Sequence, residues 1–245
     1  MGLSATKTVR ELAVEIPNAT RVFAKVGIDY CCGGKKSLDE ACAAAKLPVN
    51  EVIQALEAAG RPSQEPLAYA LPSGSLAELI DHIVETHHKF TRDEIARLQA
   101  LFEKVCSVHG KNHPELLAMR ETFRGLAQEL TVHLMKEENV LFPYIIRMEE
   151  AVVQKDPVLP SPFGTVQNPV RMMMQEHEGA GEALREIRQA SGSFTAPADA
   201  CLSYQTLYQA LQAFEADLHQ HIHLENNILF PRAVALEENA VGATH

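Results

Sequence analysis

The chain has 245 residues, of which 46% are hydrophobic and 22% are charged, a composition typical of a globular protein. Its 32 acidic and 22 basic residues give a formal charge of −10, which argues against a general nucleic-acid or anionic-membrane surface. No secretory signal is evident, no stretch approaches about 18 apolar residues, and the five cysteines lack a disulfide-framework spacing. We therefore expect a cytoplasmic protein of one or two domains, without membrane spans.

Helical periodicity begins in the N-terminal region, at residues 8–60. Short helices are expected there, because capping residues and terminal glycines recur at helical spacing. The predicted boundaries are Asn18 to Gly27, a capping box from Ser37 to Glu40, Asn50 to Gly60, and a further capping box from Ser75 to Glu78.

A linker is predicted at residues 61–74, which contain three prolines and a glycine. It would separate a small N-terminal helical domain, residues 1–60, from a larger domain, residues 75–245. The larger domain shows four long helical patterns, at about 76–106, 114–150, 169–190 and 203–238. These patterns predict an all-α protein in which an up-down four-helix bundle follows the small domain.

An internal repeat is the strongest pattern in the chain. Residues 133–143 read HLMKEENVLFP and residues 221–231 read HIHLENNILFP, with six of eleven positions identical at an offset of 88 residues. His88 and His177 are related by the same offset to within one residue. Each half of the larger domain therefore offers one lone histidine on its first helix and a His-x-x-x-Glu motif on its second.

The spacing of these residues suits a metal site. Residues four apart lie on one helix face, so each His-x-x-x-Glu can direct both side chains to one point. Two such helix pairs in a bundle core suit a dinuclear centre in which two glutamates bridge the metals. Imidazole with carboxylate suits iron, although ligand type alone leaves zinc and manganese open. The predicted ligands are His88, His133, Glu137, His177, His221 and Glu225.

Other histidines lie close to these ligands. A single His-x-x-x-Glu is most often a surface feature of an amphipathic helix, but its duplication within a repeat favours the metal site. His219 and His223 flank His221 and point away from its face, so we expect them at the surface. The match to the second half favours His88 over His87 as the ligand on the first helix.

Three acidic residues also stand near the predicted ligands. Glu129 and Asp217 each precede a ligand histidine by four residues, and Glu176 directly precedes His177. An acid so placed either accepts an imidazole N–H and orients the ligand, or is an ordinary solvated side chain. The sequence leaves both interpretations open.

Cys31 and Cys32 lie in a glycine-containing loop, DYCCGG, ahead of a predicted helix. A thiol in such a loop has a lowered pKa and is reactive when it lies near a helix N-terminus and cationic groups such as Lys35 and Lys36. The alternative is a pair of buried loop cysteines without chemistry. Plain packing is expected for the cysteines on helical patterns, Cys42, Cys106 and Cys201.

Four segments together, DYCCGG, HLMKEENVLFP, QEHEGAGE and HIHLENNILFP, resemble the RIC family of di-iron proteins for repair of iron centres, which includes ScdA, YtfE and DnrN. The resemblance covers nearly the whole chain, as a ScdA-type N-terminal domain and a hemerythrin-like bundle. It implies two non-haem iron ions, joined by an oxo bridge, on the same six ligands. It also implies a functional, catalytic cysteine pair at Cys31 and Cys32, and it matches acidic positions at Glu129 and Glu176.

Family membership implies a cytoplasmic bacterial protein that responds to nitric oxide and oxidative stress and repairs damaged iron–sulfur clusters. Its partners would be damaged iron–sulfur proteins, with nitric oxide or oxygen as small ligands, and it would act by iron donation or by nitric-oxide chemistry. Enzymatic nitric-oxide reduction and the oligomeric state stay open. The alternative is a hemerythrin-like protein that binds or senses oxygen or nitric oxide, or stores iron, without repair. The cysteine-containing domain favours repair, because a carrier does not need it.

Overall fold

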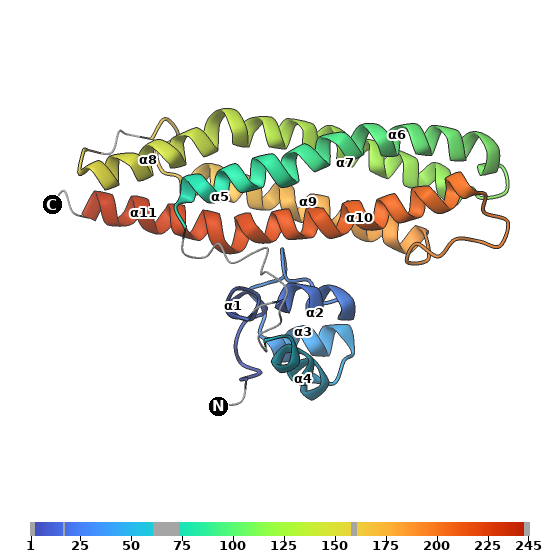
Figure 1. Cartoon of the computed structure of the whole chain (residues 1–245), viewed down its shortest axis with the longest axis horizontal. Helices are drawn as coiled ribbons and strands as arrows, with labels where there is room; N and C mark the ends of the chain where they lie inside the picture. Colours follow the sequence, from blue (N-terminus) through green and yellow to red (C-terminus); the bar gives the residue numbers. More distant parts are fainter. Residues whose placement is uncertain (1–2, 17, 61–73, 158–160, 243–245) are drawn as a thin grey trace.

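The computed structural model describes residues 3–16, 18–60, 74–157 and 161–242, which form a small helical domain beside a long bundle (Figure 1). The described residues contain helices and one isolated bridge between Thr8 and Ser37, which confirms the all-α prediction. The N-terminal domain contains α1 (Val9–Glu15), α2 (Ala19–Val26), α3 (Leu38–Ala45) and α4 (Val49–Ala59). The predicted linker lies outside the described residues, except for Gly74.

Capping boxes start three of the helices. The hydroxyls of Thr8, Ser37 and Ser75 each accept the N–H of a glutamate three residues later, and that glutamate accepts the N–H of the cap. The capping boxes at Ser37 and Ser75 confirm the predicted ones. The capping box at Thr8, which starts α1, was not predicted. The predicted cap at Asn50 is wrong. Pro48 occupies the N-cap of α4, and Asn50 lies inside the first turn, where a preceding proline already fixes the chain direction.

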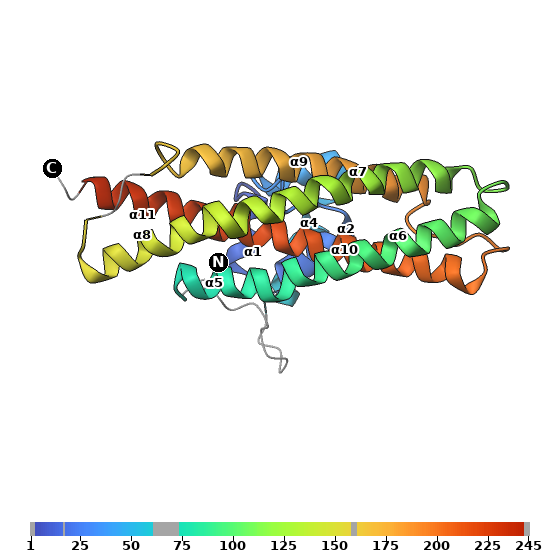
Figure 2. The same cartoon turned by 90° about the horizontal axis from the view of Figure 1, so that it is seen from above.

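Four long helices in up-down order build the bundle (Figure 2). The first contains α5 (Leu76–His82), η1 (Ile83–His88) and α6 (Lys89–His109), and the second contains α7 (Glu115–Lys136), η2 (Glu137–Leu141) and α8 (Phe142–Gln154). The third is α9 (Gln167–Ala190), and the fourth contains α10 (Leu202–Leu224), η3 (Glu225–Leu229) and α11 (Phe230–Gly242). The third helix begins earlier than predicted because a first-turn proline, Pro169, needs no hydrogen-bond partner for its nitrogen.

The segments η1, η2 and η3 are π-helical turns, and each contains a predicted ligand. His88 ends η1, Glu137 begins η2 and Glu225 begins η3. In the last two, the N–H groups of Phe142 and Phe230 donate to the carbonyls of these glutamates, five residues earlier. Such turns are frequent at functional sites, because they widen the helix and alter the direction of nearby side chains.

Proline explains the position of two of these wide turns. Pro143 and Pro231 are the second residues of α8 and α11. A proline inside a helix lacks an N–H and crowds the carbonyl four residues earlier. Those carbonyls belong to Asn139 and Asn227, which lie within η2 and η3. The wider π turn relieves the crowding without ending the helix.

In each half of the bundle, a glutamate on the second helix accepts backbone N–H groups at the start of the first helix. Glu149 of α8 accepts the backbone N–H groups of Leu76 (2.6 Å) and Ala77 (3.0 Å). Glu237 of α11 accepts the backbone N–H of Val166 at the start of α9 (3.0 Å). The two glutamates are 88 residues apart, so the repeat extends to the caps.

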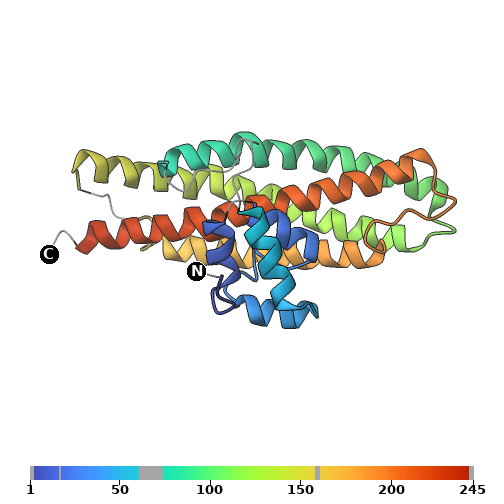
Figure 3. The ribbon, with the colours of Figure 1, turned by 60° about the horizontal axis from the view of Figure 1, so that its bottom comes forward.

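The N-terminal domain packs against one side of the bundle, where α1 contacts η3 (Figures 1 and 3). Its apolar side chains are continuous with a core formed by α6, α7, α9 and α10. A second apolar core joins α5, α8, α11 and the first turns of α9. The predicted ligands lie between these two cores and are thereby shielded from water. None of the helices described is long and apolar enough to cross a membrane.

Candidate metal centre

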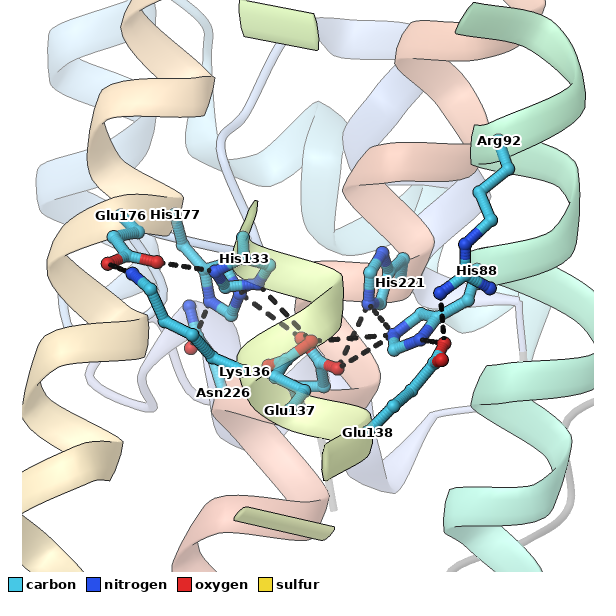
Figure 4. Close-up of polar contacts among 11 residues, drawn as sticks. His88, Arg92, His133, Lys136, Glu137, Glu138, Glu176, His177, His221 and Asn226 are labelled. Carbon is cyan, nitrogen blue, oxygen red and sulfur yellow. Dashed lines mark hydrogen bonds and ion pairs between the residues drawn. The ribbon is translucent and has the colours of Figure 1, made fainter. Parts of the chain in front are cut away.

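All six predicted ligands meet inside the bundle, each from a different helix or π turn. Figure 4 labels five of them, all except Glu225. Each is almost fully buried, with at most 2% of its surface exposed. They fall into two groups that share both glutamates. The groups are His88 and His221 with Glu137 and Glu225, and His133 and His177 with Glu137 and Glu225.

The imidazole nitrogens in each group are spaced as neighbouring ligands of one metal ion. The Nε2 atoms of His88 and His221 are 3.1 Å apart, and those of His133 and His177 are 3.0 Å apart. Two nitrogens at right angles around a metal, each at about 2.1 Å, would be separated by about 3.0 Å. The chain therefore holds both pairs at a spacing that fits metal coordination.

The two carboxylates lie between the groups. Glu137 Oε2 is 3.4 Å from Nε2 of His88 and 3.3 Å from Nε2 of His133, which belong to different groups. Both oxygens of Glu137 and Oε2 of Glu225 are buried without a hydrogen bond of good geometry. Unsatisfied buried carboxylate oxygens are costly unless a cation binds them. This arrangement fits two bridging carboxylates.

The buried glutamates and histidines of the site shift one another's pKa values. Burial raises the pKa of Glu137 to about 7. The pKa of Glu225 is held well below its ordinary value, because His221 and His177 outweigh the effect of burial. Burial opposes charge on His88 and His177, yet the glutamates raise their pKa values to about 10 and about 9. The carboxylates thus favour charged imidazoles beside them, and a bound cation would take the place of those protons.

Three of the four predicted ligand histidines donate their Nδ1–H to a neighbouring side-chain oxygen, which directs Nε2 toward the site. The pairs are His88 with Glu138 (2.7 Å), His133 with Glu176 (2.8 Å) and His177 with Asn226 (2.9 Å).

Surface cations hold two of these acceptors in place (Figure 4). Arg92 donates to Glu138 at 2.7 Å, and Lys136 pairs with Glu176. Of the acids left open by the sequence, Glu176 therefore contacts a predicted ligand histidine, His133, in the manner of an orienting group. Glu129 is exposed on the outer face of α7, so the interpretation as an orienting group is wrong for it.

Comparison with known proteins shows which families the two domains match. Residues 79–233 match the model of the hemerythrin HHE cation binding domain, and residues 5–60 match ScdA_N, a domain of unknown function. A probable iron-sulfur cluster repair protein of Haemophilus influenzae is 36% identical over 94% of this chain and 97% of its own length. The chain belongs to the iron-sulfur cluster repair protein family. Relatives named iron-sulfur cluster repair protein YtfE, from Escherichia coli O8 and Shigella boydii, are each 37% identical over 93% of this chain and 96% of theirs. The resemblance seen in the sequence is confirmed.

The cysteine loop of this family member lies directly behind a ligand helix. The Cys32 thiol is 3.5 Å from the backbone carbonyl of His177. Asn226, whose side-chain oxygen accepts from the His177 ring, donates its amide N–H to the carbonyl of Cys31 (3.2 Å). One side chain therefore joins a predicted metal ligand to the thiol loop.

The two thiols of the loop differ. Their sulfurs are 3.7 Å apart, and the Cys31 thiol donates to Cys32 and to Asp29. This hydrogen bond to Cys32, together with burial, raises the pKa of Cys31 well above its usual range. The same bond lowers the pKa of Cys32 despite partial burial. Cys32 is thus the thiol with the lowered pKa and is partly exposed, while Cys31 is buried.

The expectation that His219 and His223 face solvent is wrong. The ring of Tyr30, from the cysteine loop, lies 5.6 Å from the buried His223 ring and 6.3 Å from that of His219. Asn227 donates one amide N–H to His223 Nδ1 (2.8 Å) and another to the carbonyl of Tyr30 (2.9 Å). These histidines form the surface on which the N-terminal domain docks. Their neighbour Asp217 contacts His87 at 3.0 Å and not a predicted ligand.

Elsewhere, the packing prediction holds for two cysteines and fails for one. Cys42 and Cys106 are buried in the apolar core. Cys201 is exposed, because it occupies the N-cap of α10 at the end of a loop.

Proposed function

We propose that this chain is a cytoplasmic protein that repairs iron–sulfur clusters damaged by nitric oxide or oxidative stress. Its partners would be damaged iron–sulfur proteins, as the names of its relatives indicate for those proteins. Its resident cofactor would be two non-haem iron ions joined by an oxo bridge. The proposed ligands are His88 and His221 for one iron, His133 and His177 for the other, and Glu137 and Glu225 as bridges.

The residues around the site have separate tasks in this proposal. Bound iron would supply electron transfer and a binding position for nitric oxide or oxygen. Glu138 and Glu176 accept the outer N–H groups of two ligand imidazoles and fix their orientation. Apolar cores on either side limit access by water, while a diatomic gas is small and uncharged enough to enter.

The observation that carries repair, rather than gas binding alone, is the position of the cysteine loop on the metal-ligand helix. We propose that residues 1–60 and 75–245 act as two units. Cys31 and Cys32 would pass iron from the bundle to a client, so the iron held by the six ligands would also be the iron that is delivered. A buried site of imidazoles and carboxylates offers no thiolate, and a damaged cluster is ligated by thiolates. Cys32 lies against the backbone of His177, which places a soft ligand beside the helix that would hold the iron.

The experiment measures recovery of a nitric-oxide-damaged iron–sulfur enzyme in the presence of wild-type chain or of the double variant Cys31→Ala, Cys32→Ala. The double variant should retain its iron and lose most of the recovery. Cys201→Ala removes an exposed thiol far from the site and should repair like the wild type. Full recovery with the double variant would exclude the relay. That result would favour nitric-oxide chemistry at the di-iron centre, including enzymatic nitric-oxide reduction, as the mechanism.

A further inference from the structure

The two halves of the bundle orient their ligand histidines with different residues at equivalent positions. Glu176 directly precedes His177, and it accepts the Nδ1–H of His133 at 2.8 Å. In the other half, the residue that directly precedes His88 is His87. The repeat therefore places an imidazole where its other copy has a carboxylate.

His87 lies buried beside His221, the repeat counterpart of His133, with 1% of its surface exposed. The rings of His87 and His221 are nearly parallel, with planes 6° apart and centroids 5.9 Å apart. Nδ1 of His221 and Nε2 of His87 are both buried and lack a hydrogen-bond partner. On its other side, Nδ1 of His87 lies 3.0 Å from Oδ1 of Asp217. A donor and an acceptor left unpaired on adjacent rings cost free energy that one hydrogen bond would recover.

We propose that Asp217 and His87 form a hydrogen-bonded chain that orients His221 as a metal ligand. Asp217 accepts the Nδ1–H of His87, which leaves a lone pair on Nε2 of that ring. A His221 ring that binds metal through Nε2 carries its proton on Nδ1 and donates it to this lone pair. A bond of about 2.9 Å between the two nitrogens would pair both of these unsatisfied atoms.

His87 is thus a positioning residue and not a ligand, and this inference rests on the proposed six-ligand site. It also explains the chemical asymmetry of the repeat. In each proposed pair of histidines, the Nδ1–H of one histidine would be accepted by a carboxylate and that of the second histidine by a neutral group. The acceptors are Glu138 for His88, Glu176 for His133, Asn226 for His177 and, in this proposal, His87 for His221. Each iron would then have one imidazole made more basic by a carboxylate and one that is not, which balances the two sites.

The test compares three substitutions of His87 in the full-length chain, with iron affinity, Mössbauer spectra and midpoint potential as readouts. His87→Leu removes the acceptor and should weaken the binding of one iron by about 10- to 100-fold, as is usual when an orienting partner is lost. One of the two iron signals should change and the other should not. His87→Gln offers an amide oxygen at similar reach and should retain both irons. His87→Glu should lower the midpoint potential, because a carboxylate acceptor stabilises the ferric state.

The other half of the bundle supplies the matched control. Glu176→Gln replaces the equivalent carboxylate by a neutral acceptor, so it should raise the midpoint potential and change the other iron signal. The inference is overturned if His87→Leu keeps wild-type affinity and both signals, or if His87→Gln loses iron while melting at the wild-type temperature. Failure of the proposed site itself gives a different result, in which wild-type chain binds no iron pair or His221→Leu retains both ions.

Discussion

Replacing Glu137 by glutamine should stabilise the metal-free protein and empty the metal site. Glu137 is fully buried, and neither of its oxygens has a hydrogen bond of good geometry. In the absence of metal, a charged carboxylate at this position is therefore a source of instability. With iron bound, the substitution should instead destabilise the protein, because a neutral amide cannot replace a bridging carboxylate.

The magnitude follows from the pKa of Glu137. Burial raises it from the ordinary value of 4.5 to about 7, so the folded chain keeps a proton that the unfolded chain has lost in this range. At about 1.36 kcal/mol per pKa unit, the carboxylate costs the metal-free fold about 3 kcal/mol at pH above 7. The contribution of Glu137 to the stability of the metal-free protein should therefore fall as pH rises from 4.5 to 7, whereas buried His133 and His223, whose pKa values are lowered to about 4, contribute in the opposite direction in both proteins. The stability of the glutamine variant relative to wild type should therefore rise over this range.

Urea unfolding of chelator-treated protein at pH 5 and pH 7.5, followed by circular dichroism, measures the effect. Glu138→Gln is the matched control. Burial alone would raise the pKa of Glu138, but His88 and Arg92 lower it below the ordinary value. Loss of the Glu138 carboxylate should therefore slightly destabilise the metal-free protein. A glutamine variant at position 137 that is less stable than wild type at pH 7.5 without metal would refute the reasoning.

Three further predictions concern the ligands and the domains. His221→Leu should remove most of the iron. His223→Leu should retain the iron and expose Cys32 to thiol reagents, because His223 supports the cysteine loop. Iron analysis combined with thiol labelling distinguishes the two variants. Glu225→Leu should weaken magnetic coupling or leave mononuclear iron, and unchanged susceptibility would show that Glu225 does not bridge. A chain that begins at residue 75 should still bind two irons by elemental analysis, because all six ligands lie beyond that point; a large loss of iron would show that the docked domain is needed.

The sequence predicts the bundle and the grouping of six side chains for a local reason. Spacing of four residues places His133 with Glu137, and His221 with Glu225, on one helix face in any tertiary context. The repeat then relates the two faces to each other. His88 needed the repeat as well, since nothing in its own helix distinguishes it from the adjacent histidine.

Contacts between distant segments were not predictable in the same way. His219 and His223 point away from the bundle core, as their spacing indicates, yet Tyr30 of the other domain covers them. Periodicity describes one helix and its nearest core, and it contains no information about a second domain docked on the opposite face. Glu149 and Glu237, which cap helices more than 70 residues away in sequence, were missed for the same reason.

The π turns have a consequence for how this chain tolerates insertions and deletions. A π turn holds one residue more than the α-helical turn it replaces, so the helix after it is rotated by about 100° relative to an uninterrupted helix. Deleting a single residue from η2 or η3 would restore regular winding and turn the whole of α8 or α11 away from its packing partners. Substitutions in these turns change one side chain, whereas a one-residue deletion shifts every side chain up to the helix end. Alignments of relatives should therefore show no gaps across residues 137–141 and 225–229, even where their side chains differ.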